Sequence, residues 1–89
     1  MIKGQKYRGI SYKCGVGYYN DEKWAKASND LETIPGLEND PQVCEMLVKC
    51  HINQGNTNRA KKFFDMALNS YKKEGLDDKA ERLSDKYKL

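Results

Sequence analysis

The chain has 89 residues, with 38% hydrophobic and 33% charged side chains and a formal net charge of +3, which suits one small folded domain but leaves little room for a buried catalytic cavity. No run approaches the roughly 18–20 apolar residues that span a bilayer, and residues 1–10 lack the hydrophobic region of a secretion signal. We therefore expect a cytoplasmic location and no membrane partner. Three cysteines cannot all pair within one chain, so we also expect reduced thiols.

Charge is unevenly distributed along the chain. Residues 1–20 carry four basic and no acidic side chains, whereas residues 21–41 carry two basic and six acidic ones. Residues 61–89 carry eight basic and six acidic side chains. This segregation favours electrostatic selection of a partner protein, or of a self-association geometry, over a broad nucleic-acid-binding surface.

The first predicted helix runs from about Tyr7 to Tyr19 and follows a flexible lead-in over residues 1–7. Its apolar stripe is formed by residues at i, i+4 and i+8, namely Ile10, Cys14 and Tyr18. Glycine in a helix interior costs roughly 1 kcal/mol relative to alanine. The glycines of this helix therefore predict close approach of another backbone; they are Gly9, Gly15 and Gly17.

A second helix is predicted after Asn20 and Asp21, which are candidates both for the end of the first helix and for the N-cap of the second. Its inward side chains are expected to be Trp24, Ala27, Leu31 and Ile34. Pro35 and Gly36 end this helix, because proline lacks the backbone donor that a continuing helix needs. Residues 37–40 are expected to form a linker.

A third helix is predicted over about residues 41–54. Asp40 is its expected N-cap, Pro41 suits its first turn, and Gly55 suits the C′ position just after its end. Residues 56–58 supply caps for a fourth helix. Its wide apolar stripe consists of Ala60, Phe63, Phe64, Ala67, Leu68 and Tyr71.

After Gly75, a final amphipathic helix is predicted, capped by Asp77 or Asp78. Its apolar side carries Leu76, Ala80, Leu83 and Tyr87. No segment alternates with period two for long enough to form a strand. The predicted fold class is therefore all-α.

The segment from Leu47 to Ala67 has a counterpart 33 residues earlier in the chain. Its fixed positions are Leu47, His51, Gly55, Ala60, Phe64 and Ala67, and their counterparts are Cys14, Tyr18, Glu22, Ala27, Leu31 and Ile34. Together with Tyr12-Lys13-Cys14-Gly15 and Asn53-Gln54-Gly55-Asn56, this pattern resembles two consecutive tetratricopeptide repeats.

The resemblance implies a first repeat over residues 8–40, a second over 41–73 and a capping helix over 74–89. It further implies about five antiparallel helices in a short right-handed superhelix. In this family, the first helix of each repeat lines a concave groove. The corresponding positions here are Gly9, Tyr12, Val16, Tyr19 and Asn20 in the first repeat, and Gln42, Glu45, Lys49, Ile52 and Asn53 in the second.

We therefore predict a non-catalytic, adaptor-like or chaperone-like module that binds a peptide or helix of another protein in this groove. The predicted partner-binding residues are Tyr12, Val16, Tyr19, Asn20, Glu45, Lys49, Ile52 and Asn53. Some family members hold a C-terminal carboxylate with a clamp of Lys and Asn. Capture of that kind is not expected, because the corresponding positions here are Tyr12, Val16 and Met46.

Two other functions stay open. One is a small inhibitor of a host enzyme, which fits the size of the chain. The other is a helical nucleic-acid binder that uses basic side chains of the C-terminal half, namely Lys61, Lys62, Lys72, Lys73, Lys79, Arg82, Lys86 and Lys88. Acidic residues interspersed among these lysines favour a solvated surface over this alternative.

No metal, cofactor or catalytic site is predicted. Zinc would take four ligands of the kind found in Cys14, Cys44, Cys50 and His51, but no two of the cysteines form a CxxC pair. We interpret the three thiols as buried small hydrophobic groups and His51 as a packing residue between helices. The sequence contains no glycine-rich phosphate loop and no paired-carboxylate motif.

Self-association is the first testable prediction. Roughly three or more stacked repeats are usually needed for stability, so two repeats and a cap should leave apolar surface that requires cover. We expect an oligomer or an obligate complex in which Tyr12, Val16, Tyr19 and Ile52 lose solvent exposure, as measured by analytical ultracentrifugation and hydroxyl-radical footprinting. A monodisperse monomer of high thermal stability, without a partner, would contradict it.

Overall fold

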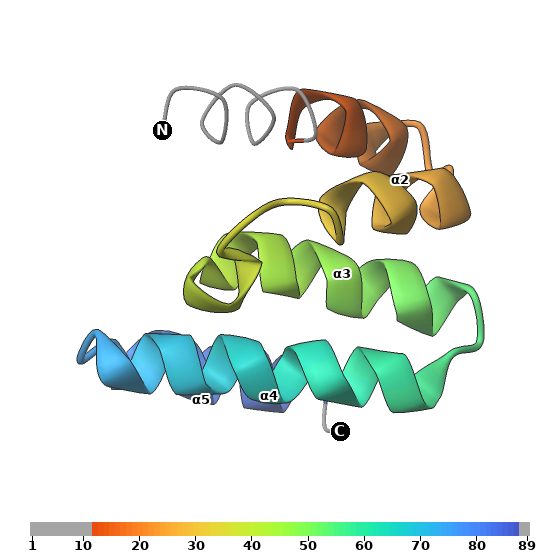
Figure 1. The fold of residues 1–89 in the computed structure, drawn as a ribbon. Coiled ribbons are helices and arrows are strands. Elements are labelled where there is room, and N and C mark those ends of the chain that lie inside the picture. The colour runs from red at the N-terminus through yellow and green to blue at the C-terminus, as the bar shows by residue number, and fades with distance from the viewer. Residues whose placement is uncertain (1–11, 88–89) are drawn as a thin grey trace.

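The computed structural model describes residues 12–87, and over this range the chain consists of helices and short connections, without a strand (Figure 1). The elements in chain order are a helical segment over residues 12–20, α2 (Trp24–Leu31), the 3-10 helix η1 (Leu37–Asn39), α3 (Pro41–Asn53), α4 (Thr57–Lys73) and α5 (Asp77–Tyr87). The predicted all-α fold class is confirmed for these residues. The expected lead-in over residues 1–7, together with Gly9 and Ile10, lies outside them.

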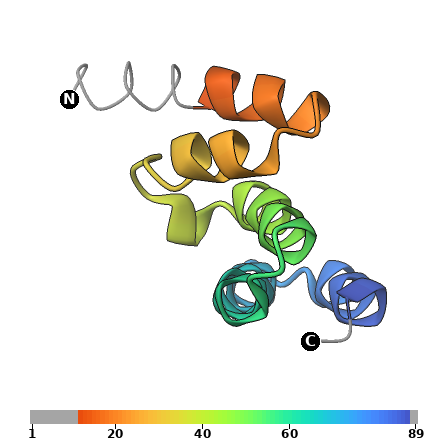
Figure 2. The ribbon, with the colours of Figure 1, turned by 90° about the vertical axis from the view of Figure 1, so that its right-hand side faces the viewer.

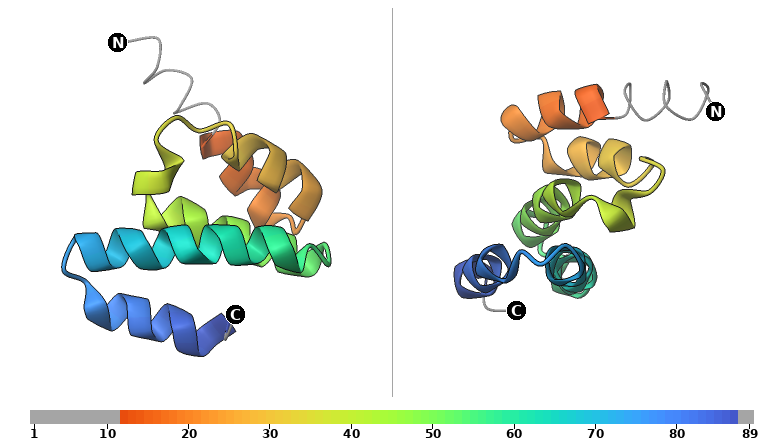
Figure 3. Two further views of the ribbon diagram at one scale, coloured as in Figure 1. Left: turned by 60° about the horizontal axis from the view of Figure 1, so that its bottom comes forward. Right: turned by 90° about the vertical axis from the view of Figure 1, so that its left-hand side faces the viewer.

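The helices pack mainly on their neighbours in sequence, and the most extensive contact joins the antiparallel helices α3 and α4. Figure 2 shows residues 12–20, α3 and α5 toward one side of the molecule and α2 and α4 toward the other. The right view of Figure 3 shows the same arrangement from the opposite side, and the left view shows α5 beside α4. Alternate helices of the described chain therefore share a face.

The core lies between the two layers. It is built from the apolar stripes predicted for the last three helices, with two side chains from the end of the α2 region. Its members include Leu31, Ile34, Val43, Leu47, Val48, Phe63, Phe64, Ala67, Tyr71, Ala80 and Leu83. Each fully buried Leu or Val side chain contributes about 1.5–3 kcal/mol relative to an exposed one, so this cluster dominates the stability of the domain.

The end signals of the third helix are confirmed. Asp40 is the N-cap of α3, its Oδ1 accepts a hydrogen bond from the Val43 amide at 3.4 Å, and Pro41 occupies the first turn. The linker before α3 is more ordered than expected, since it contains η1. Two side chains hold η1 in place, because Cys44 Sγ donates to the Leu37 carbonyl at 3.2 Å and Ser70 Oγ donates to the Glu38 carbonyl at 2.7 Å.

The second helix is shorter than predicted. It spans Trp24–Leu31, and the residue before it is Lys23, whose side chain makes no capping hydrogen bond. The stop expected at Asn20 and Asp21 is confirmed, because the preceding helix ends at residue 20 and the turn occupies residues 21–22. Neither residue is the N-cap of α2, so that part of the prediction is wrong. The chain leaves the helix after Leu31, although Ile34 is still buried.

Three turns of the molecule have the same backbone geometry. Glu22, Gly55 and Gly75 adopt positive φ angles of 60°, 78° and 76°. In each turn, the amide of this residue donates to the carbonyl three residues earlier, and the next amide donates to the carbonyl five residues earlier. These are the two bonds that close a helix end through a left-handed C′ residue.

The side chains around these turns also recur. A side chain with a ring lies four residues before each left-handed residue, and a buried alanine lies five residues after it. The rings are Tyr18, His51 and Tyr71, and the alanines are Ala27, Ala60 and Ala80. The pattern that was recognised in the sequence at Glu22 and Gly55 is therefore also present at the junction between α4 and α5.

The glycines of the first helix are explained only in part. A Cβ atom on Gly15 would lie 2.5 Å from Leu31 Cδ2 and 3.4 Å from the Leu31 backbone nitrogen, so close approach is confirmed there. At Gly17 the prediction is wrong, because no atom lies within 4 Å of such a Cβ. Cys14 was expected to be buried, but its side chain is exposed.

Five further predicted apolar-stripe positions are less buried than expected. Leu76 is 36% exposed, and the half-buried ones are Tyr18, Trp24, Leu68 and Tyr87. The Lys26 ammonium lies 5.7 Å from the centre of the Tyr18 ring, so this ring is covered by a lysine side chain and not by the apolar core.

The turn geometry predicts the effect of two substitutions. The left-handed conformation costs a non-glycine residue roughly 1 kcal/mol or more, so Glu22→Gly should raise the free energy of unfolding by about 0.5–1 kcal/mol. Gly55→Ala should lower it by about 1 kcal/mol, which is about 4–8 °C in melting temperature for a domain of this size. Both values are measured by urea and thermal unfolding.

Glu22→Ala is the control, because it removes the charge but keeps a side chain at positive φ. It should leave stability within about 0.5 kcal/mol of the parent. If Glu22→Gly and Glu22→Ala had the same effect, backbone strain at this turn would be refuted.

Candidate functional site

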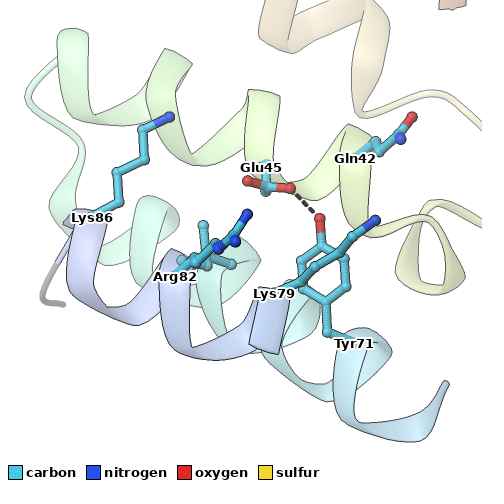
Figure 4. Close-up of a pocket in the computed structure, with 7 residues that line it drawn as sticks. Gln42, Glu45, Tyr71, Lys79, Arg82 and Lys86 are labelled. Atoms are coloured by element: carbon cyan, nitrogen blue, oxygen red, sulfur yellow. Dashed lines mark hydrogen bonds between the residues drawn. The ribbon is translucent and has the colours of Figure 1, made fainter. Parts of the chain in front are cut away.

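A groove of about 300 Å³ lies between α3 and α5, with α4 beneath it (Figure 4). It is lined by Gln42, Glu45, Tyr71, Lys79, Arg82, Leu83 and Lys86. Leu83 and Tyr71 are 2% and 5% exposed, so they close the floor of the groove, while the long polar side chains of α3 and α5 form its walls.

The α5 wall is cationic. Lys79, Arg82 and Lys86 are spaced i, i+3 and i+7, which places them on one face of the helix, and Figure 4 shows their charged ends directed toward α3. All three side chains are exposed. None of them forms an ion pair with another residue within 12–87, so the wall presents three positive charges to solvent.

The α3 wall carries one carboxylate, on Glu45, which accepts a hydrogen bond from the Tyr71 hydroxyl. Burial raises the pKa of Tyr71, and the hydrogen bond to Glu45 and the charge of that carboxylate raise it further. The phenol proton is therefore retained, and Tyr71 holds the Glu45 carboxylate against the α4 side of the groove. The groove as a whole keeps an excess of positive charge.

A second cluster joins this groove to the first helical segment. The rings of Tyr19 and Trp24 meet edge to face, with centroids 5.5 Å apart. The Lys49 ammonium lies 5.6 Å from the centre of the Tyr19 ring and 5.7 Å from that of Trp24, within the range of cation–π attraction.

Tyr87 of α5 extends the same face. Burial raises the pKa of Tyr19, and the nearby Tyr87 contributes to this shift. Burial also raises the pKa of Tyr87, with the Glu45 carboxylate as the next cause. Side chains from residues 12–20, α3 and α5 therefore lie close enough to influence one another electrostatically.

The predicted partner-binding residues all retain some exposure. Those brought into contact are Tyr19 and Lys49, while Glu45 faces α5. The others are spread over the surface: Tyr12 is 39% and Ile52 38% exposed, Asn20 and Asn53 are exposed, and Val16 is half-buried. The Asn53 side-chain amide donates to the Lys49 carbonyl at 2.8 Å, so it is engaged within its own helix.

The sequence prediction of this groove omitted the α5 wall. Lys79, Arg82 and Lys86 were grouped only with other basic residues as a nucleic-acid-binding alternative. Their spacing on one helical face was the available signal. This spacing does not show that α5 lies opposite Gln42 and Glu45, because the position of α5 depends on tertiary packing.

His51 is buried, as expected for a packing residue, and its ring stacks on Phe63 with centroids 5.5 Å apart. It also has an acidic partner, which the sequence analysis did not identify, since His51 Nε2 lies 2.8 Å from Glu32 Oε2. A carboxylate only accepts hydrogen bonds, so Nε2 carries the proton. The buried Nδ1 atom has no hydrogen-bond partner among the described residues.

The two thiols of α3 are buried, as predicted. Burial raises the pKa of Cys44 to about 12 and that of Cys50 to about 11, so neither forms a nucleophilic thiolate near neutral pH. Among residues 12–87, no three His, Cys, Asp or Glu side chains lie close enough together to hold a metal ion. None of the helices in that range is both long and apolar enough to cross a membrane.

Comparison with protein-family models, with curated proteins and with solved structures finds no match for this chain.

The hydrogen bond between Tyr71 and Glu45 predicts a change in alkaline stability. An unfolded tyrosine loses its proton near pH 10, whereas folded Tyr71 retains it to higher pH. The unfolded state therefore binds fewer protons, and the free energy of unfolding should fall as the pH rises above about 10. Below about pH 10, the contribution of the Tyr71 hydrogen bond to the free energy of unfolding is fully present.

Tyr71→Phe should lower stability at pH 7 by about 1 kcal/mol and make the alkaline decline shallower by up to about 1.4 kcal/mol per pH unit. Urea unfolding between pH 7 and 11 measures both. Tyr12→Phe is the control, because Tyr12 is exposed and should change neither value. Equal alkaline slopes for Tyr71→Phe and the parent would exclude the retained phenol proton.

Proposed function

We propose that this chain is a non-catalytic protein-interaction module, built like a short tetratricopeptide array, that binds a segment of another protein on the face shared by residues 12–20, α3 and α5. The observation that carries the proposal is the contact of Lys49 on α3 with the Tyr19 ring, one helical turn from Glu45, which lines the groove with α5. Helices distant in sequence would then contribute jointly to one ligand.

The recurring turns support the repeat-like part of the proposal. Glu22, Gly55 and Gly75 close the preceding helix in the same way, and a buried alanine follows each at the same distance. A small side chain at that position permits the next helix to pack closely. The junction at Gly75 supports interpreting α5 as the first helix of a third, incomplete unit.

The chemistry of the surface favours binding over catalysis. Within the described chain, the shared face combines aromatic rings, amides and long cationic side chains, which suit recognition of a peptide or helix. The buried thiols are poor nucleophiles, and His51 is 1% exposed with its Nε2 engaged by Glu32. These groups therefore offer no accessible acid, base or nucleophile.

Affinity capture from the source cell tests the proposal. The bait proteins are the parent, a face variant with Tyr19→Ala and Lys49→Ala, and a control with Lys61→Ala and Asn69→Ala on exposed positions of α4. Both variants remove one lysine, and circular dichroism verifies that both are folded. Nuclease treatment of each lysate removes proteins retained through nucleic acid.

We expect a protein partner that the parent and the control retain and that the face variant binds at least about tenfold more weakly, as expected for loss of central aromatic contacts. The purified partner is then measured by calorimetry against all three. The proposal is wrong if no protein binds the parent directly, or if the face variant binds as tightly as the control.

A further inference from the structure

The geometry points to an acidic α-helix of a partner protein as the ligand of the groove between α3 and α5. This inference rests on the proposed protein-binding function and specifies its ligand. The three cations of α5 carry it, because they line one wall of the groove and have no ionic partner among residues 12–87. A row of like charges along one wall of a groove favours a ligand of opposite charge.

The spacing of the cations favours a helical ligand. With a rise of about 1.5 Å per residue, Lys79 and Lys86 originate about 10.5 Å apart along α5, and Arg82 lies between them. Carboxylates at i, i+3 and i+7 of a helix beside α5 repeat with the same rise. In an extended segment, three side chains on one face span about 13 Å, which matches this row less well.

The opposite wall of the groove restricts the ligand further. Glu45 is held by Tyr71, and Gln42 lies on the same helix, so a ligand must place a hydrogen-bond donor or a neutral group toward α3. A helix with acidic residues on one side and polar donors on another satisfies both walls. A nucleic-acid backbone is less suitable, because every nucleotide carries a phosphate and those beside α3 would be repelled by the Glu45 carboxylate.

A synthetic helix tests this inference. The probe is a fluorescein-labelled peptide of about 15 residues, the length at which isolated helices become stable, with glutamates at i, i+3 and i+7 on one face and alanine and glutamine elsewhere. A second peptide has the same composition with its glutamates distributed around the helix. A third replaces the three glutamates by glutamine. Binding is measured by fluorescence anisotropy.

The groove variant carries Lys79→Glu, Arg82→Glu and Lys86→Glu. Its matched control carries Lys61→Glu, Lys62→Glu and Lys73→Glu at exposed positions of α4. The net charge changes equally in both variants, so the non-specific attraction between the protein and an acidic peptide falls equally in both. Thermal unfolding verifies that both variants fold, and Lys79→Gln with Lys86→Gln serves as a milder variant if charge reversal prevents folding.

We expect the patterned acidic helix to bind the parent and the α4 control with similar affinity, and the groove variant at least about tenfold more weakly. The peptide with distributed glutamates and the glutamine peptide should both bind the parent less tightly. Raising the salt concentration should weaken the specific interaction, since these charges lie at an open rim.

Three results would overturn the inference. They are equal binding of the groove variant and the α4 control, equal binding of the patterned and distributed peptides, and tighter binding of a single-stranded DNA oligonucleotide than of the patterned peptide at the same ionic strength. If a partner captured through Tyr19 and Lys49 bound the groove variant as tightly as the parent, the proposed acidic helix would be the wrong ligand. The proposed protein-binding function would still hold.

Discussion

The antiparallel contact between α3 and α4 is the interaction on which the remaining structure depends. Leu47, His51 and Phe64 are buried in or beside it, and the turn at Gly55 holds the two helices in register. The same pair anchors both ends of the described chain. Glu32 of the preceding segment bonds to His51, and Tyr71 of α4 bonds to Glu45 in the groove next to α5. Loss of this contact would therefore separate the groove walls as well as the core.

Polar contacts connect the helices α3 and α4 to the preceding elements of the chain. The Gln54 side-chain amide lies 3.2 Å from Ser28 Oγ and 3.4 Å from the Trp24 carbonyl, so the end of α3 is tied to α2. At the other end, Ser70 of α4 binds the backbone of η1. These directional bonds limit sliding between helices, which apolar contacts alone do not prevent.

Much of the fold could be predicted from the sequence because its signals were local. Asp40-Pro41 marks a helix start, Gly55 marks an end, and the stripe from Ala60 to Tyr71 has helical spacing. Glu22 was not recognised as a left-handed turn residue, because glutamate disfavours that conformation and adopts it only under the constraint of the packed helices. Trp24 resembled a core residue by size, but its surroundings depend on Tyr19 and Lys49.

The candidate site was predictable only on the α3 side. Glu45 and Lys49 followed from the helical register of a repeat. The facing row of Lys79, Arg82 and Lys86 has the charge pattern of an ordinary solvated helix surface, and only the tertiary packing of α5 places it opposite α3. A one-dimensional pattern distinguishes buried from exposed faces, but it does not indicate which exposed face lies opposite another.

The hydrogen bond from Tyr71 to Glu45 has a kinetic consequence. Because the Glu45 carboxylate is held at α4, it is not free to swing across the groove and neutralise the α5 cations. These charges act through solvent over a Debye length of about 8–10 Å. They therefore attract an oppositely charged molecule before contact and raise the association rate constant, whereas the dissociation rate depends on the short-range contacts made afterwards.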